Sequence, residues 1–268
     1  DLDGALADAT TALAIAPDNA NAAAIVASIK VQAGKPDEAI AVLRNAQEKA
    51  PGNVAITTLL ARLFNQMGRA DDAEKAMREV VAREPDVLGH RLLLAQLLIQ
   101  NKQLDRAEEA LKEAIARPNL SAKDANTARL SLVEFLARLR SADSAITTLE
   151  DMVKADPGNF DLRFALGKLF EAARKPEDAR QVYKGIVGDE KEPESPNALA
   201  AKTRMAVVES RLGNRSAAKA LVDEVLKASA GNLDALVLRG TMASEDGQPG
   251  AAVADFRAAL KNNPDNLD

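Results

Sequence analysis

Apolar residues recur along this chain with the spacing of one face of an α-helix, in two sets for every 34 residues. In residues 20–53, the first set includes Ala23 and Ala27, and the second includes Ala39 and Leu43. Members of a set follow one another at steps of i, i+4 and i+7, which places them on one side of a helix. The pattern therefore predicts two amphipathic helices in this stretch.

Glycine, proline and asparagine mark the ends of these two helices. Gly34 permits a left-handed exit from the first helix, and Pro36 is tolerated in the first turn of the second. Pro51 ends the second helix, and Asn53 can cap the next one by accepting a backbone N–H. The stretch is thus a predicted helix-turn-helix hairpin. One such hairpin cannot bury its apolar face alone, so its neighbours must stack against it.

The hairpin recurs with a fixed period, because Pro17, Pro51 and Pro85 are each 34 residues apart. A period of this size is the signature of a stacked repeat array. The repeats are 1–19 (a second helix only), 20–53, 54–87, 88–125, 126–159, 160–198, 199–232 and 233–266. Two of them are longer than the rest, with insertions at 118–125 and 188–198. We therefore expect a single all-α solenoid over residues 1–268.

Composition narrows the class of partner. Hydrophobic residues make up 47% of the chain but aromatic residues only 3%, so the core is built mainly from Ala, Leu and Val. The net charge of −5 argues against nucleic acid or an anionic membrane surface as the main partner. The chain has no Cys, which excludes disulfides and thiolate metal sites. No apolar run reaches membrane-spanning length, so we expect no direct membrane insertion.

Both ends of the sequence fall inside the repeat pattern. Asp1 stands where the second helix of a hairpin begins, and residues 266–268 stand where another repeat would start. We therefore expect that the chain is a fragment of a longer protein whose targeting segments are missing.

The repeat resembles the tetratricopeptide repeat (TPR), a 34-residue unit of two helices with large and small residues at set positions. Counting positions from the first residue of each repeat, Ala occupies position 20 in all eight second helices, and Ala or Gly occupies position 8 in six of seven first helices. The family's Trp at position 4 is absent, and position 11 is aromatic only at Phe64 and Phe170. The resemblance implies a right-handed superhelical α-solenoid whose first helices line a concave groove that binds proteins or peptides.

The helical angle separates two stripes on each first helix. Positions 4, 7, 8 and 11 face the partner helices, whereas positions 2, 5, 9 and 12 lie about 140° away and face the predicted groove. The predicted partner-binding residues are an apolar track with flanking polar residues: Arg62, Leu92, Gln96, Ile99, Leu130, Glu134, Phe164 and Lys168. Apolar anchors with a polar rim are what a peptide or partner helix requires.

Two interpretations of this track stay open. Its apolar side chains bind a partner, or they pack beneath the insertion at 118–125, where the repeat geometry is distorted. In the first repeat, Ala24 and Ser28 give a small and plain groove face. We therefore expect the function to lie in residues 88–198.

The residues that chemistry would require are not grouped in the sequence. His90 is the only histidine and has no local nucleophile and acid beside it, so no catalytic residue and no His or Cys metal site is predicted. No GxxxxGK[ST] phosphate loop occurs, and no cofactor is expected. The Lys and Asn with which some TPR proteins hold a peptide's C-terminal carboxylate are missing from positions 5 and 9. The acidic, proline-containing loop at 188–196 is interpreted as a spacer.

These observations favour a non-enzymatic scaffold or adaptor for a protein or peptide ligand. Two alternatives remain: the targeting arm of a larger enzyme or secretion component, and a structural protein that self-assembles into a homo-oligomer. The Ala-rich repeats are similar to those of bacterial envelope proteins, including proteins of polysaccharide export. On that ground a periplasmic or outer-membrane-associated location is favoured over the cytoplasm.

Overall fold

The structure, a computed structural model, is entirely α-helical over the residues that it describes, 2–262, as the sequence predicts. Within that range the helices are α1 (Leu2–Ile15), α2 (Ala20–Gln32), α3 (Pro36–Lys49), α4 (Val54–Gln66), α5 (Ala70–Arg83), α6 (Leu88–Gln100), α7 (Leu104–Ile115), α8 (Ala122–Leu139), α9 (Ala142–Ala155), α10 (Phe160–Ala172), α11 (Pro176–Asp189), α12 (Pro196–Arg211), α13 (Arg215–Ala228), α14 (Leu233–Glu245) and α15 (Pro249–Asn262). Asp1, Pro264 and the expected start of another repeat at 266–268 lie outside the described residues.

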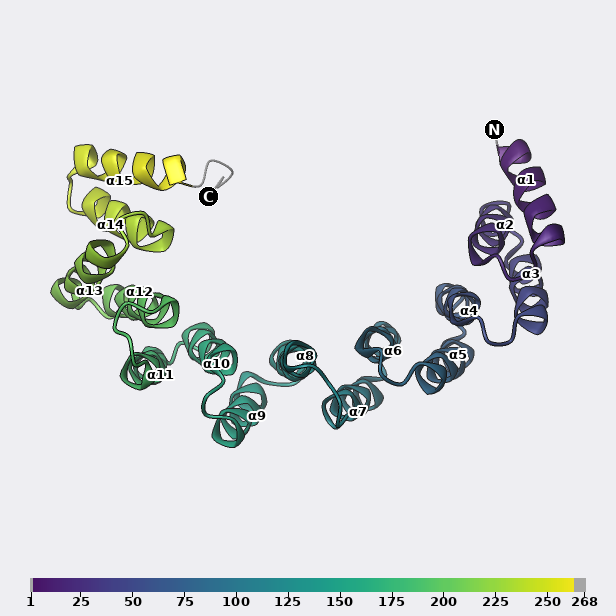
Figure 1. Cartoon of the computed structure of the whole chain (residues 1–268), viewed down its shortest axis with the longest axis horizontal. Helices are drawn as coiled ribbons and strands as arrows, with labels where there is room; N and C mark the ends of the chain where they lie inside the picture. Colours follow the sequence, from purple (N-terminus) through teal and green to yellow (C-terminus); the bar gives the residue numbers. More distant parts are fainter. Residues whose placement is uncertain (1, 263–268) are drawn as a thin grey trace. The chain divides into compact units, whose positions relative to one another are not determined.

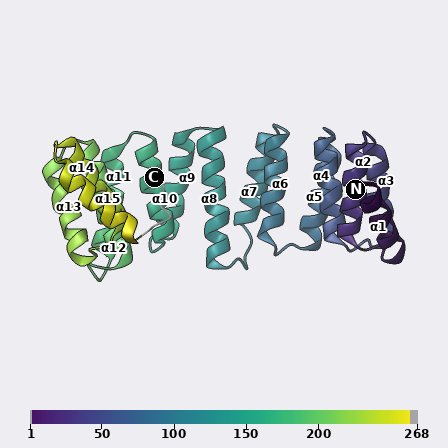
Figure 2. The ribbon, with the colours of Figure 1, turned by 90° about the horizontal axis from the view of Figure 1, so that it is seen from above.

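The chain divides into two compact units, Asp1–Phe135 and Leu136–Asp268, and the boundary falls within α8. In unit 1 the first helices of successive hairpins, α2, α4 and α6, lie on one side, and the second helices α3, α5 and α7 lie on the other (Figure 1). Figure 2 shows these helices next to one another with their axes nearly aligned. In unit 2 the first helices are α10, α12 and α14, and they alternate with α11, α13 and α15 in the same way.

Side-chain caps begin several of the first helices. Asn53 accepts a hydrogen bond from the backbone N–H of Ile56 at 3.2 Å, which confirms the predicted cap. Asn19 caps α2 through the N–H of Ala22 at 3.0 Å. Each cap satisfies one of the backbone donors that the first turn of a helix leaves free.

The turn inside each hairpin contains a residue in the left-handed region. Gly34 and Gly68 have φ of 73° and 71°, which confirms the predicted left-handed exit. The same position of the next repeat is Lys102, with φ of 59°, and Arg174 occupies it in unit 2 with φ of 58°. At these two residues the backbone adopts a left-handed conformation, which costs an L-residue about 1–2 kcal/mol.

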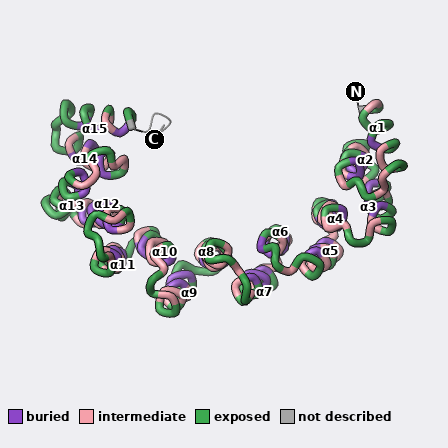
Figure 3. The backbone as a smooth tube through the Cα atoms, viewed as in Figure 1, coloured by how far each residue is buried: buried purple, intermediate pink, exposed green. Residues whose placement is uncertain are grey.

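Alanine at position 20 lets the two helices of a hairpin approach closely. Ala39, Ala73 and Ala107 are completely buried, and so are the equivalent Ala145 and Ala179 of unit 2. Figure 3 shows buried stretches on α5 and α7, the helices to which Ala73 and Ala107 belong. The small side chain at this position is therefore a packing requirement of the repeat.

The residues at positions 8 and 24 compensate for each other in volume. Position 8 is Gly only at Gly167 and Gly240, the two repeats in which position 24 is aromatic. A Cβ added at Gly167 would lie 2.4 Å from the ring of Tyr183, and one added at Gly240 would lie 2.7 Å from the ring of Phe256. The ring occupies the space that a side chain at position 8 would need, so the pair must change together.

The turn geometry gives a first prediction. Gly68→Ala is expected to destabilise the chain by about 1 kcal/mol, because alanine at a positive φ is strained. Lys102→Gly is expected to stabilise it by up to about 1 kcal/mol, because glycine removes that strain at the equivalent position. Urea unfolding of the full chain, followed by circular dichroism, measures both changes. Effects of the same sign for the two variants would contradict this account.

The volume compensation gives a second prediction, in the form of a double-mutant cycle. Gly240→Ala alone is expected to destabilise the chain by about 1–2 kcal/mol, because its Cβ collides with the ring of Phe256. In a Phe256→Leu background the same change is expected to stabilise, because alanine is the better helix former by about 1 kcal/mol. Urea unfolding of all four chains measures the coupling between the two sites. Equal effects of Gly240→Ala in both backgrounds would show that the two positions are independent.

Candidate functional site

Two hollows lie on the side of unit 1 formed by the first helices, which we call the α2–α4–α6 face. Hollow A lies between α2 and α4 and has a volume of about 290 Å³; Ala27, Ser28 and Leu43 are among its lining residues. Hollow B lies between α4 and α6, has a volume of about 280 Å³, and is lined in part by Ala61 and Met77. The face is therefore recessed at two successive repeats.

The two hollows are the same feature displaced by one repeat. Ala27 and Ala61 both occupy position 8, and Leu43 and Met77 both occupy position 24. These apolar side chains form part of the floor of each hollow.

Arg62 is common to both hollows. It is an exposed residue of α4 and lines hollow A on one side and hollow B on the other. No ion pair or hydrogen bond of its side chain is found among the described residues. An unpaired cation thus stands between two apolar recesses.

A stripe of glutamines follows the edge of the same face. Gln32, Gln66 and Gln100 occupy position 13 of three successive repeats, and all three are exposed. Gln100 accepts a hydrogen bond from the side-chain amide of Asn65 at 2.8 Å, and Asn101 donates to Asn65 at 2.6 Å. The other two glutamines make no side-chain hydrogen bond with the described part of the chain, so their amides can both donate and accept.

Carboxylates are absent from the α2–α4–α6 face. The three helices α2, α4 and α6 contain no Asp or Glu, although the whole chain carries a net charge of −5. The second helices hold three acidic residues in α3, four in α5 and four in α7. The two sides of unit 1 therefore differ in charge.

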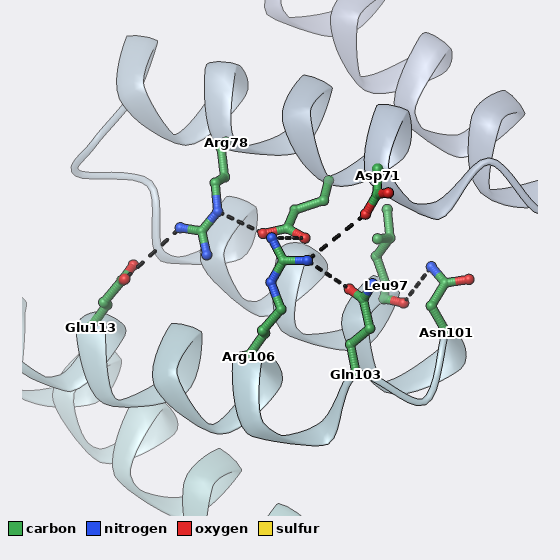
Figure 4. Close-up of polar contacts among 8 residues, drawn as sticks. Asp71, Arg78, Leu97, Asn101, Gln103, Arg106 and Glu113 are labelled. Carbon is green, nitrogen blue, oxygen red and sulfur yellow. Dashed lines mark hydrogen bonds and ion pairs between the residues drawn. The ribbon is translucent and has the colours of Figure 1, made fainter.

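The carboxylates of the second helices are largely held by neighbouring cations. Glu74 of α5 has only 2% of its side chain exposed, and it lies 2.8 Å from the Nε of Arg78 and 2.7 Å from the Nη2 of Arg106. Figure 4 shows this cluster, with Asp71 and Glu113 at its edges. It joins α5 to α7, so we interpret it as a contact between neighbouring repeats.

The structure brings two of the predicted partner-binding residues together. Arg62 and Gln96 both line hollow B. Leu92 is half-buried and packs, with Leu120 of the insertion, against a small cluster of buried residues: Leu88, Ala114 and Ala128. Leu92 therefore has the packing that the second interpretation of the track expects, and it lines neither hollow.

The other predicted residues lie elsewhere. Ile99 of α6 and Leu130 of α8 are half-buried, and Glu134 of α8 is exposed. Phe164 and Lys168 belong to α10 of unit 2. The ring of Phe164 is half-buried, 6.2 Å from the ring of the completely buried Tyr183, whereas Lys168 is exposed. A continuous track through both units stays a prediction.

Sequence reasoning missed the features that define the hollows. Ala24 and Ser28 were interpreted as a plain surface, but both line hollow A, and their small size helps to leave it open. The glutamine stripe follows the 34-residue period and was available in the sequence. So was the distribution of acidic residues, had they been counted separately for first and second helices.

Unit 2 contains a buried carboxylate, Glu171, that is hydrogen-bonded by three side chains of the same chain. Glu171 of α10 has 5% of its side chain exposed and accepts hydrogen bonds from the hydroxyl of Tyr183 at 2.7 Å, from Arg204 at 2.7 Å and from Arg211 at 2.9 Å. These partners come from α11 and α12, so the carboxylate joins three helices. Burial, and then the hydrogen bond to Glu171, raise the pKa of Tyr183.

His90 lies beside a single carboxylate in the structure. Its Nε2 lies 2.7 Å from a carboxylate oxygen of Glu84, and the pair is close to the surface. Over residues 2–262 no cluster of three or more His, Cys, Asp or Glu side chains could hold a metal ion. In the same range, no helix has the length and apolar character needed to cross a bilayer.

Comparison with known proteins identifies the repeat. Profiles described as tetratricopeptide repeat match residues 1–63, 30–92, 66–123 and 136–202, and another of that description matches residues 203–266. No curated protein matches the chain in sequence.

Several solved structures match the chain at low sequence identity. The C-terminal part of a TPR repeat-containing protein from Cytophaga hutchinsonii is 13% identical, with a TM-score of 0.53 over 90% of this chain and 95% of that one. A tetratricopeptide repeat protein from Parabacteroides merdae is 15% identical, with a TM-score of 0.49 over 88% and 90%. A monomeric mutant of IFIT1 is 16% identical, with a TM-score of 0.49 over 92% of this chain, which spans 60% of that protein's length.

The raised pKa of Tyr183 gives a prediction for alkaline pH. A folded-state pKa above the unfolded value of about 10 means that the folded chain binds the proton more tightly. The contribution of Tyr183 to the free energy of unfolding is fully present below pH of about 10. Above that pH it falls by about 1.4 kcal/mol per pH unit, up to the folded-state pKa. Because the chain has one Tyr, tyrosinate absorbance is expected to appear only as the circular dichroism of the folded chain is lost.

Tyr183→Phe is the control for this titration, because it keeps the ring and removes the ionising group. Its stability is expected to fall less steeply than that of the natural chain above pH of about 10. Tyrosinate absorbance that rises near pH 10 while the circular dichroism stays native would contradict the prediction.

Proposed function

This chain belongs to the tetratricopeptide repeat family, and on that premise we propose that it is a protein-binding scaffold whose ligand site is the α2–α4–α6 face of unit 1. The repeats and their solved relatives support a protein–protein interaction scaffold in general. The choice of face comes from the geometry of this chain.

The observation that carries the proposal is the pair of hollows in register on one exposed face. Each has an apolar floor and a mouth that includes the unpaired Arg62. Recessed apolar surface with a few polar groups around it is the usual form of a recognition site, because side chains of a partner lose water there while the polar groups fix their orientation. The surface of a first helix without such recesses would offer a partner little area to bury.

The second-helix side of unit 1 supports the same choice by contrast. Its buried carboxylate, Glu74, is paired with Arg78 and Arg106 of the chain itself. Charges that are already neutralised gain little from a partner, since the partner would have to replace existing ion pairs. On the α2–α4–α6 face, Arg62, Gln32 and Gln66 have no side-chain partner among residues 2–262.

The proposal also covers setting and partners. The ligand is a protein or peptide, the site is non-catalytic, and the main partner is neither nucleic acid nor lipid. We place the protein at the bacterial envelope, in the periplasm or at the outer membrane, within a complex such as one of polysaccharide export. That placement rests on the Ala-rich composition of the repeats. A secretory signal with a lipid-attachment cysteine in the intact gene product supports it, and a cytoplasmic gene product contradicts it.

Filling the hollows tests the site. A random peptide library displayed on phage is selected on the immobilised full chain, and selected peptides are then titrated by fluorescence polarisation. Ser28→Trp and Gln96→Trp place a large side chain at the mouths of hollow A and hollow B, respectively. Each variant is expected to weaken binding by about tenfold, the loss of one anchor of about 1.4 kcal/mol.

Ala41→Trp is the matched control, because Ala41 is an exposed residue of α3 on the second-helix side. It is expected to leave binding unchanged. All three positions are exposed, so all three variants are expected to keep the unfolding free energy within about 0.5 kcal/mol. Failure to select any peptide, or peptides that are insensitive to both hollow variants, would contradict the proposed site.

A further inference from the structure

The charge and spacing of the two hollows indicate the chemistry of the ligand, and this inference rests on the proposed function. We infer that the bound segment is an extended stretch of polypeptide with two apolar side chains three residues apart and an acidic side chain between them. The apolar side chains enter hollows A and B, and the acidic side chain pairs with Arg62.

Arg62 is the available cation of the α2–α4–α6 face. The other basic residues of these helices are engaged: Lys30 pairs with Glu38 at 2.6 Å, and Arg91 is 9% exposed and donates to a backbone carbonyl. Arg62 is exposed and has no ion-pair partner among residues 2–262. A carboxylate of the ligand would supply that partner through charge-assisted hydrogen bonds.

The same face presents no charge that would repel an acidic ligand. A carboxylate near α2, α4 or α6 meets no Asp or Glu of those helices, although the chain as a whole is acidic. A basic ligand would be repelled by Arg62 and would find no carboxylate on these three helices. Charge complementarity therefore selects an acidic segment for this face.

The register of the hollows sets the spacing of the apolar side chains. The hollows are displaced by one repeat, and packed helices lie about 8–10 Å apart. A polyproline-II chain has three residues per turn and advances about 3.1 Å per residue, so the side chains of residues i and i+3 project to the same side about 9 Å apart. Apolar residues at i and i+3 thus reach both hollows, with Arg62 between them.

The glutamine stripe favours an extended ligand over a helical one. An extended segment has unpaired backbone N–H and C=O groups along its length, whereas a helix satisfies its own. The amides of Gln32 and Gln66 each offer a donor and an acceptor at the edge of hollow A. Gln100 lines hollow B, and its amide N–H groups remain free to donate. Amides at one-repeat intervals can bind the backbone without regard to sequence.

An internal acidic residue fits better than a free C-terminus. Hollows lie on both sides of Arg62, so the ligand continues in both directions past the cation. A terminal carboxylate opposite Arg62 would leave one hollow empty. The acidic group is therefore an Asp or Glu side chain within the segment.

The test uses synthetic peptides with acetylated and amidated ends, titrated against the full chain. The reference peptide carries Leu-Ser-Asp-Leu between Gly-Ser flanks. One analogue has Asn in place of Asp. Two others place the leucines at i and i+2 or at i and i+4. A fourth ends in a free carboxylate after Asp. The reference is expected to bind best, with a preference for Asp over Asn of about twofold to fivefold that declines with added salt.

Two variants show where the preference originates. Arg62→Gln is expected to abolish the preference for Asp while keeping the preference for leucines three residues apart. Lys75→Gln removes an exposed cation from α5 on the second-helix side, and it is expected to leave both preferences unchanged. Circular dichroism of each variant checks that the fold is retained.

The outcomes separate this inference from the proposed function. If peptides selected from the library bind at the hollows, but Asp and Asn peptides bind equally or the preference for Asp survives Arg62→Gln, the inference about the ligand is wrong and the scaffold proposal stands. Tightest binding of the peptide with the free carboxylate would also overturn it. If no peptide of either origin binds the chain, the proposed function is wrong, and the inference about the ligand is wrong with it.

Discussion

The close packing of position 8 of each first helix on position 24 of its second helix is the constraint on which the rest of this structure depends. The two helices of a hairpin must approach closely to bury their apolar faces. In unit 2 this contact is made by Gly167 with Tyr183, whose ring fills the space that a Cβ at Gly167 would need. In unit 1 the equivalent pairs are Ala27 with Leu43 and Ala61 with Met77, and each pair lines one hollow.

The same pairs reach the surface of the first-helix face in unit 1. The two hollows are lined by both members of each pair. The side chains that close the core of these two hairpins therefore also form the floor of the recesses.

Much of the fold could be predicted from the sequence, because it depends on local chemistry. This holds for the repeat period, the helix faces, the Asn53 cap and the left-handed turn at Gly34. The left-handed turn at Lys102 could not be predicted from residue type, since the stacked neighbours impose it on a side chain that disfavours it. Arg62 and Gln96 line the same hollow, but their role as partner-binding residues stays a prediction. The sequence left open whether Leu92 binds a partner or packs beneath the insertion, because helical angle alone does not reveal what an insertion covers; in the structure Leu92 and Leu120 pack against the same buried cluster.

Size also misled the prediction for the first repeat. Large apolar residues were taken as the sign of a binding surface, whereas a recess requires small residues such as Ala24 and Ser28 between larger ones. A pattern of side-chain volumes read across neighbouring repeats carries that information, but a pattern read along one helix does not. The distribution of carboxylates between first and second helices is likewise seen only when several repeats are compared.

Helices α4 and α10 also differ in the residue at position 12 and in how it is satisfied, and this difference is a second reason, after the hollows, to propose recognition in unit 1. In α10, Glu171 at position 12 is buried and is neutralised by Arg204 and Arg211 of α12. In α4, position 12 is the neutral Asn65, and Arg62 is left without a carboxylate partner. A buried carboxylate held by two arginines joins repeats and is costly to separate. An exposed arginine without a partner among residues 2–262 can pair with a ligand without breaking an existing ion pair, which is why we propose the ligand site beside Arg62.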